Sequence, residues 1–261
     1  MATEIVARMA VEIEGQGPDV VLLHGLGGSS NSFTPQMSVF AGRYRSLRPD
    51  LPGSARSALP DSLTMEGLVA AILAMTEALG VTRAHFVGHS LGTILCQHIA
   101  LAAPKQVASL ALFGPLTAPP PAAREALAKR AEMARGGGLA AMAEIGDAIV
   151  KAATASATKE RQPGILAAVR ESVMRQSAAG YGATCAALAA AEAADASRIA
   201  CPTLLVTGED DVVAPPSVTR ELAEKVGGAR AHILPRCGHW TTLEAAEEVN
   251  RLLKEFLSAQ R

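Results

Sequence analysis

The stretch Gly88-His89-Ser90-Leu91-Gly92 decides how the rest of the chain is interpreted. Residues 84–87 before it are typical of a buried strand, and apolar residues from Leu91 to Ala102 recur at helical spacing. A serine between two glycines at a strand-to-helix junction matches the G-x-S-x-G pattern of a nucleophilic serine on a sharp turn. The simpler interpretation, a glycine-containing turn with a serine cap, stays open because short motifs also occur by chance.

The chemistry of this turn explains its two glycines. The chain must reverse within a few residues, which places Ser90 in a strained conformation. Side chains at positions 88 and 92 would collide with the neighbouring strand and helix, so glycine is preferred at both. The turn would expose the Ser90 hydroxyl and direct backbone N–H groups from the helix start towards negative charge.

Composition limits the classes of protein to which the chain can belong. Its 261 residues suffice for one large domain with an inserted subdomain, and 49% hydrophobic content predicts a sizeable core. A net charge of −1 without a basic block argues against nucleic-acid and anionic-membrane partners. No apolar run could span a bilayer and no secretory signal is visible, so we expect a cytoplasmic protein with four free cysteines and no zinc site.

Strand and helix patterns alternate through the first part of the chain. Val20-Val21-Leu22-Leu23 is typical of a strand buried on both faces, and it leads into an unusually glycine-rich loop at residues 24–30. Alternation of this kind indicates βαβ units and a mainly parallel sheet. The remaining predictions are an opening strand or hairpin over 4–14, helices over 32–41 and 64–79, and strands over 45–49 and 107–113.

This alternation stops at Gly114-Pro115. From residue 119 to about 196 the chain is alanine-rich with helical periodicity, and Gly136-Gly137-Gly138 and Pro163-Gly164 divide it into three or four helices. We predict a core domain of residues 1–117 and 197–261 with a helical cap of residues 118–196; a separate helical domain or a linker is the alternative. The alternation then resumes with a strand over 203–207, a helix over 216–226, a strand near 231–234 and a last helix over 241–259.

A nucleophilic serine needs a base, and the base needs a partner that fixes its tautomer. In a parallel sheet both should follow later strands, in the order Ser, Asp or Glu, His. Three acids follow the strand over 203–207: Glu209, Asp210 and Asp211, for which a solvated acidic turn is the alternative. His239 lies between the last strand and the last helix and is the candidate base. We expect His98, inside the helix that follows Ser90, to face the core. The other histidines are also expected to be structural: His24, His85, His89 and His232.

The glycine-rich loop offers a place for a developing oxyanion. Two preorganised N–H donors stabilise such a charge. Leu91 N–H at the helix start is one candidate, and Leu26 N–H in the loop is the other. A flexible turn or a phosphate cradle is the alternative for this loop. The phosphate cradle is disfavoured because no Gly-Lys-Ser or Gly-Lys-Thr ending follows.

These segments resemble the α/β-hydrolase fold superfamily over nearly the whole chain. His24-Gly25-Leu26-Gly27 resembles its oxyanion loop, Gly88–Gly92 its nucleophile turn, Gly208-Glu209-Asp210-Asp211 its acid turn and Gly238-His239 its base. The resemblance implies a mostly parallel eight-stranded sheet flanked by helices, with an inserted helical cap. It also implies that the acid is Asp211, three residues after Gly208. The motif order is most similar to 3-oxoadipate enol-lactonases and small bacterial carboxylesterases.

The expected function is a serine hydrolase that cleaves a small carboxylic ester or lactone through an acyl-enzyme at Ser90. We expect a catalytic set of Ser90, Asp211 and His239, an oxyanion hole of Leu26 and Leu91, and neither cofactor nor metal. The alternatives are C–C bond hydrolysis, cofactor-free perhydrolysis and a non-catalytic ligand receptor. Cap arginines could hold a substrate carboxylate, although most are expected on solvated helix faces: Arg124, Arg130, Arg135, Arg161, Arg170 and Arg175. One departure is Ala55, which replaces a glycine frequent in the superfamily and is given no role.

Overall fold

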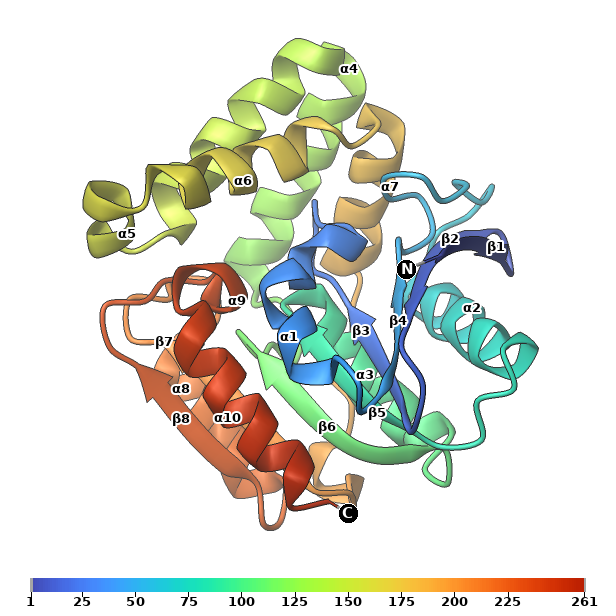
Figure 1. Ribbon diagram of the computed structural model, residues 1–261. Coiled ribbons are helices and arrows are strands. Elements are labelled where there is room, and N and C mark those ends of the chain that lie inside the picture. The colour runs from blue at the N-terminus through green and yellow to red at the C-terminus, as the bar shows by residue number, and fades with distance from the viewer. Residues whose placement is uncertain (1, 261) are drawn as a thin grey trace.

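A sheet of eight strands runs through the computed structural model, which describes residues 2–260 (Figure 1). The strand order is β1-β2-β4-β3-β5-β6-β7-β8. β2 pairs antiparallel with β1 and β4, and every other neighbouring pair is parallel. This arrangement confirms the predicted fold class. The strands are β1 Ala2–Val6, β2 Met9–Glu14, β3 Asp19–Leu23, β4 Arg45–Pro49, β5 Ala84–His89, β6 Val107–Phe113, β7 Thr203–Gly208 and β8 Arg230–Leu234.

Helices cover both faces of the sheet because its central strands are apolar on both sides. Along β3, Val21 and Leu23 join the core under α2, α3 and α8, whereas Val20 and Leu22 join the core under α1 and α10. In Figure 1, α10 and α1 lie in front of the sheet and α3 lies behind it. These helices are α1 Met37–Phe40, α2 Met65–Ala78, α3 Leu91–Ala102, α8 Pro216–Lys225 and α10 Ala246–Ser258.

Local signals place most helix ends correctly. Thr64 caps α2 by accepting a hydrogen bond from Gly67 N–H, and Gly80 follows the helix with a φ of +69°. Two helix predictions were wrong. The segment predicted over 32–41 is a 3₁₀ helix, η1 Ser30–Gln36, followed by α1. The last helix is divided into α9 Thr241–Glu244 and α10, because Ala245 leaves the helical conformation.

Between β6 and β7 the described chain forms helices only. They are α4 Pro121–Ala153, α5 Ser156–Arg161, α6 Pro163–Met174, α7 Ala178–Ala189 and the short 3₁₀ helix η2 Ala196–Arg198. Gly138 interrupts α4 with a φ of +55°, so two helical segments meet there. Figure 1 shows α4, α6 and α7 above the edge of the sheet where the parallel strands end. The treatment of residues 118–196 as a separate cap domain stays a prediction.

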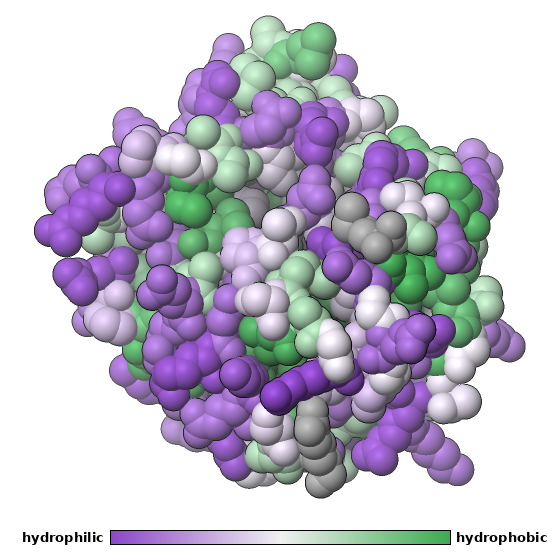
Figure 2. Space-filling model, in the orientation of Figure 1, coloured by the Kyte–Doolittle hydropathy of each residue, from purple (hydrophilic) through white to green (hydrophobic). Residues whose placement is uncertain are grey.

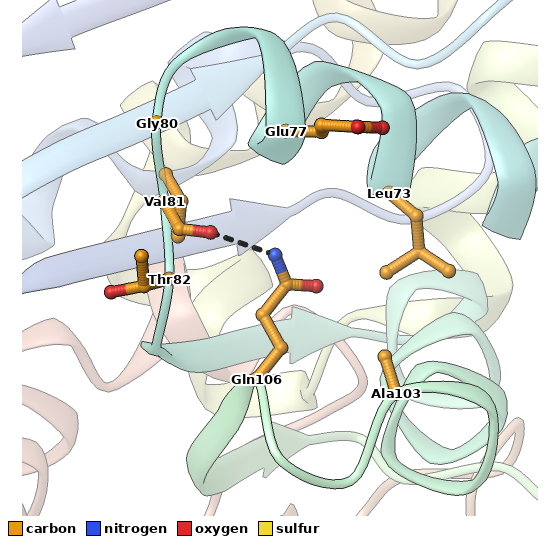
Figure 3. Close-up of a pocket in the computed structure, with 7 residues that line it drawn as sticks. All are labelled: Leu73, Glu77, Gly80, Val81, Thr82, Ala103 and Gln106. Atoms are coloured by element: carbon orange, nitrogen blue, oxygen red, sulfur yellow. Dashed lines mark hydrogen bonds between the residues drawn. The ribbon is translucent and has the colours of Figure 1, made fainter.

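Within residues 2–260, no helix is both long and apolar enough to cross a bilayer. Figure 2 shows hydrophilic residues over much of one face, with smaller apolar groups between them. A surface hollow lined by Leu73, Gly80 and Gln106, among others, lies beside the end of α2 (Figure 3). It is at the edge where β5 and β6 begin, opposite the edge that carries Ser90, and is not part of the site described below.

Candidate active site

Ser90 occupies the strained turn that the sequence predicts. It lies between β5 and α3 with φ +52° and ψ −117°, a conformation that non-glycine residues rarely adopt. A Cβ atom on Gly88 would lie 2.6 Å from the Gly92 carbonyl oxygen, and one on Gly92 would overlap the Leu23 carbonyl. Residues 88 and 92 must therefore both be glycine, and the steric clash that we inferred from the sequence is found in the structure.

Asp211 and His239 form a buried hydrogen-bonded pair. Asp211 follows β7, and its Oδ2 accepts a hydrogen bond from His239 Nδ1 at 2.8 Å. Its Oδ1 accepts hydrogen bonds from Val213 N–H at 2.8 Å and Ala214 N–H at 2.7 Å. Burial alone would raise the pKa of Asp211, but the His239 ring and the two amides outweigh it and lower the pKa. An ionised Asp211 accepts only, so Nδ1 carries the proton and Nε2 is left as the acceptor.

The His239 ring lies beside the Ser90 turn. Ser90 N–H donates to the Phe113 carbonyl at 3.0 Å, and a Cβ atom on the next residue, Gly114, would lie 3.0 Å from His239 Cε1. The rings of His89 and His239 are 5.1 Å apart between centroids. Within residues 2–260, the Ser90 hydroxyl makes no hydrogen bond, so the His239 ring lies beside the turn that carries Ser90 but is not joined to its hydroxyl. Catalytic hydrogen bonds are often long before substrate binds.

The two candidate oxyanion donors are free of competing acceptors. Leu91 is the first residue of α3, where an N–H has no acceptor within the helix. Neither its amide nor that of Leu26 donates a hydrogen bond to any described residue. His24 shapes the loop, as predicted: its Nε2 accepts from Leu51 N–H at 3.0 Å, so its Nδ1–H donates to the Gly25 carbonyl at 2.8 Å. Burial lowers the pKa of His24, which keeps the ring neutral in this role.

His89 has a supporting role that its position in the sequence did not reveal. Its Nε2–H donates to the His239 carbonyl oxygen at 2.9 Å, and its Nδ1 is buried without a partner within residues 2–260. Burial, foremost, lowers the pKa of His89 to about 3, so the ring stays neutral. The only sequence signal was its place beside Ser90, and that position did not indicate a contact with residue 239.

Glu244 anchors the loop that carries His239. Its Oε2 accepts from Gly238 N–H at 3.1 Å and from Ala155 N–H at 2.8 Å, and its Oε1 accepts from Trp240 N–H at 3.0 Å. Thr158 Oγ1–H adds a fourth hydrogen bond, at 2.7 Å. Because His239 N–H donates to the Ala153 carbonyl, three successive amides of this loop are satisfied. Sequence reasoning missed Glu244, since nothing local distinguishes it from the other glutamates of the C-terminal segment.

The other singled-out residues are structural. His85 contacts Ser109 Oγ at 2.8 Å. His98 does not face the core as predicted: it is half-buried, and its Nε2–H donates to the Glu192 carbonyl at 3.0 Å, because this side of α3 faces the segment after α7. Burial raises the pKa of the Cys237 thiol, which therefore stays protonated. Ala55 adopts a φ of +45°, the region that favours glycine.

Comparison with known proteins identifies the family of this chain. The α/β hydrolase fold family matches residues 18–246. A putative carbamate hydrolase RutD of Stutzerimonas stutzeri is 28% identical over 95% of this chain and 94% of its own. A 2-hydroxy-6-oxo-6-phenylhexa-2,4-dienoate hydrolase of Burkholderia cepacia is 29% identical over 96% and 91%. The enol-lactonase of Burkholderia xenovorans LB400 superimposes with a TM-score of 0.87 at 26% identity, covering 98% of this chain and all of its own. The chain therefore belongs to the α/β hydrolase fold family, with an enol-lactonase among its structural neighbours.

Proposed function

We propose that this hydrolase cleaves a small carboxylic ester or lactone through an acyl-enzyme at Ser90. The observation that carries the proposal is the buried His239–Asp211 hydrogen bond beside a strained, glycine-flanked serine. Asp211 fixes the tautomer in which His239 Nε2 is an acceptor. That nitrogen takes the proton of the Ser90 hydroxyl while Oγ bonds to the substrate carbonyl carbon.

The remaining steps use the same groups. The Leu26 and Leu91 amides hold the oxyanion of the tetrahedral intermediate. His239 then returns its proton to the leaving alcohol, and the acyl group stays on Ser90. Water attacks this ester, His239 accepts the proton from the water, and the proton returns to Ser90 as the acid departs. The proposed partner is thus a small-molecule ester or lactone.

Two other scissile bonds have specific support among the relatives. The likeness to a putative carbamate hydrolase favours a carbamate, which no sequence motif indicates, and the likeness to a dienoate hydrolase favours a C–C bond. Some of the cap arginines that could hold a substrate carboxylate already bond to other groups of the protein. Arg124 donates to the Ala189 and Ala191 carbonyls, and Arg170 pairs with Asp147.

A substrate panel with one variant tests the proposal. The parent protein is assayed on p-nitrophenyl esters of short acids, an enol-lactone, an aryl carbamate and a vinylogous diketone. We expect ester or lactone turnover in the parent, and a loss of about 10⁶-fold in kcat for Ser90→Ala with an unchanged fold. Normal ester turnover by Ser90→Ala would end the proposal. Faster turnover of the carbamate or of the diketone would indicate a carbamate or a C–C bond as the bond that is cleaved. Tight binding without turnover would favour a receptor.

A further inference from the structure

The cap makes hydrogen bonds to the loop that carries Leu26. Gln176 lies between α6 and α7, and its side chain is buried. Its Nε2 donates to the Gly28 carbonyl at 3.1 Å, and it shares its second proton between the Ser172 carbonyl at 2.9 Å and the Gly27 carbonyl at 3.3 Å. Ser172 Oγ–H, on α6, donates to the same Gly27 carbonyl at 2.8 Å. Two cap side chains therefore fix the carbonyls that directly follow Leu26.

The opposite end of the Gln176 carboxamide is equally committed. Its Oε1 accepts from Ala55 N–H at 2.8 Å, on the loop where Ala55 holds a positive φ. With both ends bonded, the carboxamide cannot flip without losing a hydrogen bond at each end. It therefore joins three segments that are far apart in the sequence: the glycine-rich loop, the loop after β4 and the cap.

The core fixes both ends of the glycine-rich loop, because at the far end Ser30 N–H donates to Asp50 Oδ1 at 2.7 Å. The Gly25 carbonyl accepts from His24 Nδ1–H and from Gly28 N–H. Beyond Leu26, Gly27 has a φ of +74°. A glycine can adopt this conformation easily, but it can also adopt others, so the glycine alone does not fix the backbone here. Between these two ends, Gln176 and Ser172 supply the hydrogen bonds to the Gly27 and Gly28 carbonyls, and Val173 and Tyr181 lie against Gly27.

We propose that Gln176 is a positioning residue for the oxyanion loop, which directs Leu26 N–H by holding the Gly27 and Gly28 carbonyls. This inference rests on the proposed function, because it gives Leu26 N–H an oxyanion to bind. It makes the cap part of the catalytic apparatus as well as a cover over it. A donor that is held in place stabilises the transition state without reorganisation.

Substitutions of Gln176 by side chains of similar length separate the effect of its hydrogen bonds from the effect of its packing. Gln176→Met removes both polar ends, whereas Gln176→Glu keeps the acceptor for Ala55 N–H but sets an oxygen against the two carbonyls. Gln106→Met is the matched control, because Gln106 Nε2 also donates to two acceptors, Thr76 Oγ1 and the Val81 carbonyl, at the opposite edge of the sheet (Figure 3).

The readouts are kcat and KM on the best ester, and the Ki of a trifluoromethyl ketone. Ser90 Oγ bonds to the ketone carbon, the proton passes to His239 and the carbonyl oxygen becomes the oxyanion. For Gln176→Met we expect kcat to fall about 10- to 100-fold with little change in KM, less than the loss of a whole donor. The Ki should rise by the same factor. Gln176→Glu should lose at least as much, and Gln106→Met should lower thermal stability while kcat and Ki stay within about twofold.

Several results would overturn the inference. One is a Gln176→Met protein whose kcat and Ki match those of the parent, and another is full rescue by Gln176→Glu. If Gln176→Met does not fold, Ser172→Ala removes one donor to the Gly27 carbonyl, and a kcat and Ki that do not move there would also overturn it. A parent that neither cleaves esters nor binds the ketone defeats the proposed function as well, whereas an active parent with an unaffected Gln176→Met defeats this inference alone.

Discussion

Replacing Asp211 by asparagine should disable the base without disturbing the fold. The Asp211 Oδ1 accepts from two backbone amides, Val213 N–H and Ala214 N–H, so the asparagine oxygen must take that position. Its NH₂ group then faces His239 Nδ1, which now has to accept. The ring proton moves to Nε2, the atom that should take the proton of Ser90.

The size of this effect follows from the tautomer. In serine hydrolases of this type the exchange lowers kcat about 10⁴-fold, or about 5 kcal/mol of activation free energy. KM should change little, because the lost interaction strengthens only in the transition state. The assay is steady-state ester hydrolysis with circular dichroism and thermal unfolding as checks on the fold.

The neighbouring acid provides the control. Asp210 is exposed and outside the pair, so Asp210→Asn should stay within about twofold of the parent. The reasoning is refuted if Asp211→Asn keeps more than about a tenth of the parental kcat, since such a small loss cannot come from the wrong tautomer. A large loss in Asp210→Asn instead would assign the acid to the other residue.

Three further predictions concern stability. An unfolded histidine takes up a proton below about pH 6.5, whereas native His89 does so only near its pKa of about 3. As the pH is lowered from about 6.5 to about 3, the free energy of unfolding should therefore decrease by up to about 1.4 kcal/mol per pH unit. When the free energy of unfolding is measured by urea unfolding at several pH values, its dependence on pH should be weaker for His89→Gln than for the parent. An equal dependence on pH would contradict the lowered pKa of His89. Ala7 and Arg8 both have positive φ in the two-residue turn between β1 and β2, so the exchange to Asn-Gly should raise stability by about 0.5–1 kcal/mol; a lower Tm would contradict this. Glu244→Ala leaves buried donors unpaired, including Gly238 N–H, and should lower the free energy of unfolding by about 3 kcal/mol, which an unchanged urea midpoint would exclude.

Local physics made much of the fold and the site predictable. The turn at Ser90 was predictable because any side chain at positions 88 and 92 would clash with the backbone of adjacent elements. The parallel sheet followed from apolar strands alternating with capped helices, as at Thr64. The catalytic role of the site residues stays a prediction, although Asp211 and His239 are hydrogen-bonded to each other.

The missed features depend on contacts between distant parts of the chain. Glu244 binds Ala155 across 89 positions, and Gln176 binds Gly27 across 149. Neither spacing leaves a periodic or motif-like trace, and glutamate and glutamine are ordinary surface residues elsewhere. The break at Ala245 was missed for a different reason: residues 243–248, Leu-Glu-Ala-Ala-Glu-Glu, are all favourable to helix.

Labelling with a fluorophosphonate tests the central claim most directly, because this reagent phosphonylates serines activated by a neighbouring base. The account predicts one adduct per chain, carried by the peptide that contains Ser90, with labelling lost in Ser90→Ala and strongly slowed in His239→Ala. An adduct on a different residue, or none in a protein that still hydrolyses esters, would contradict it.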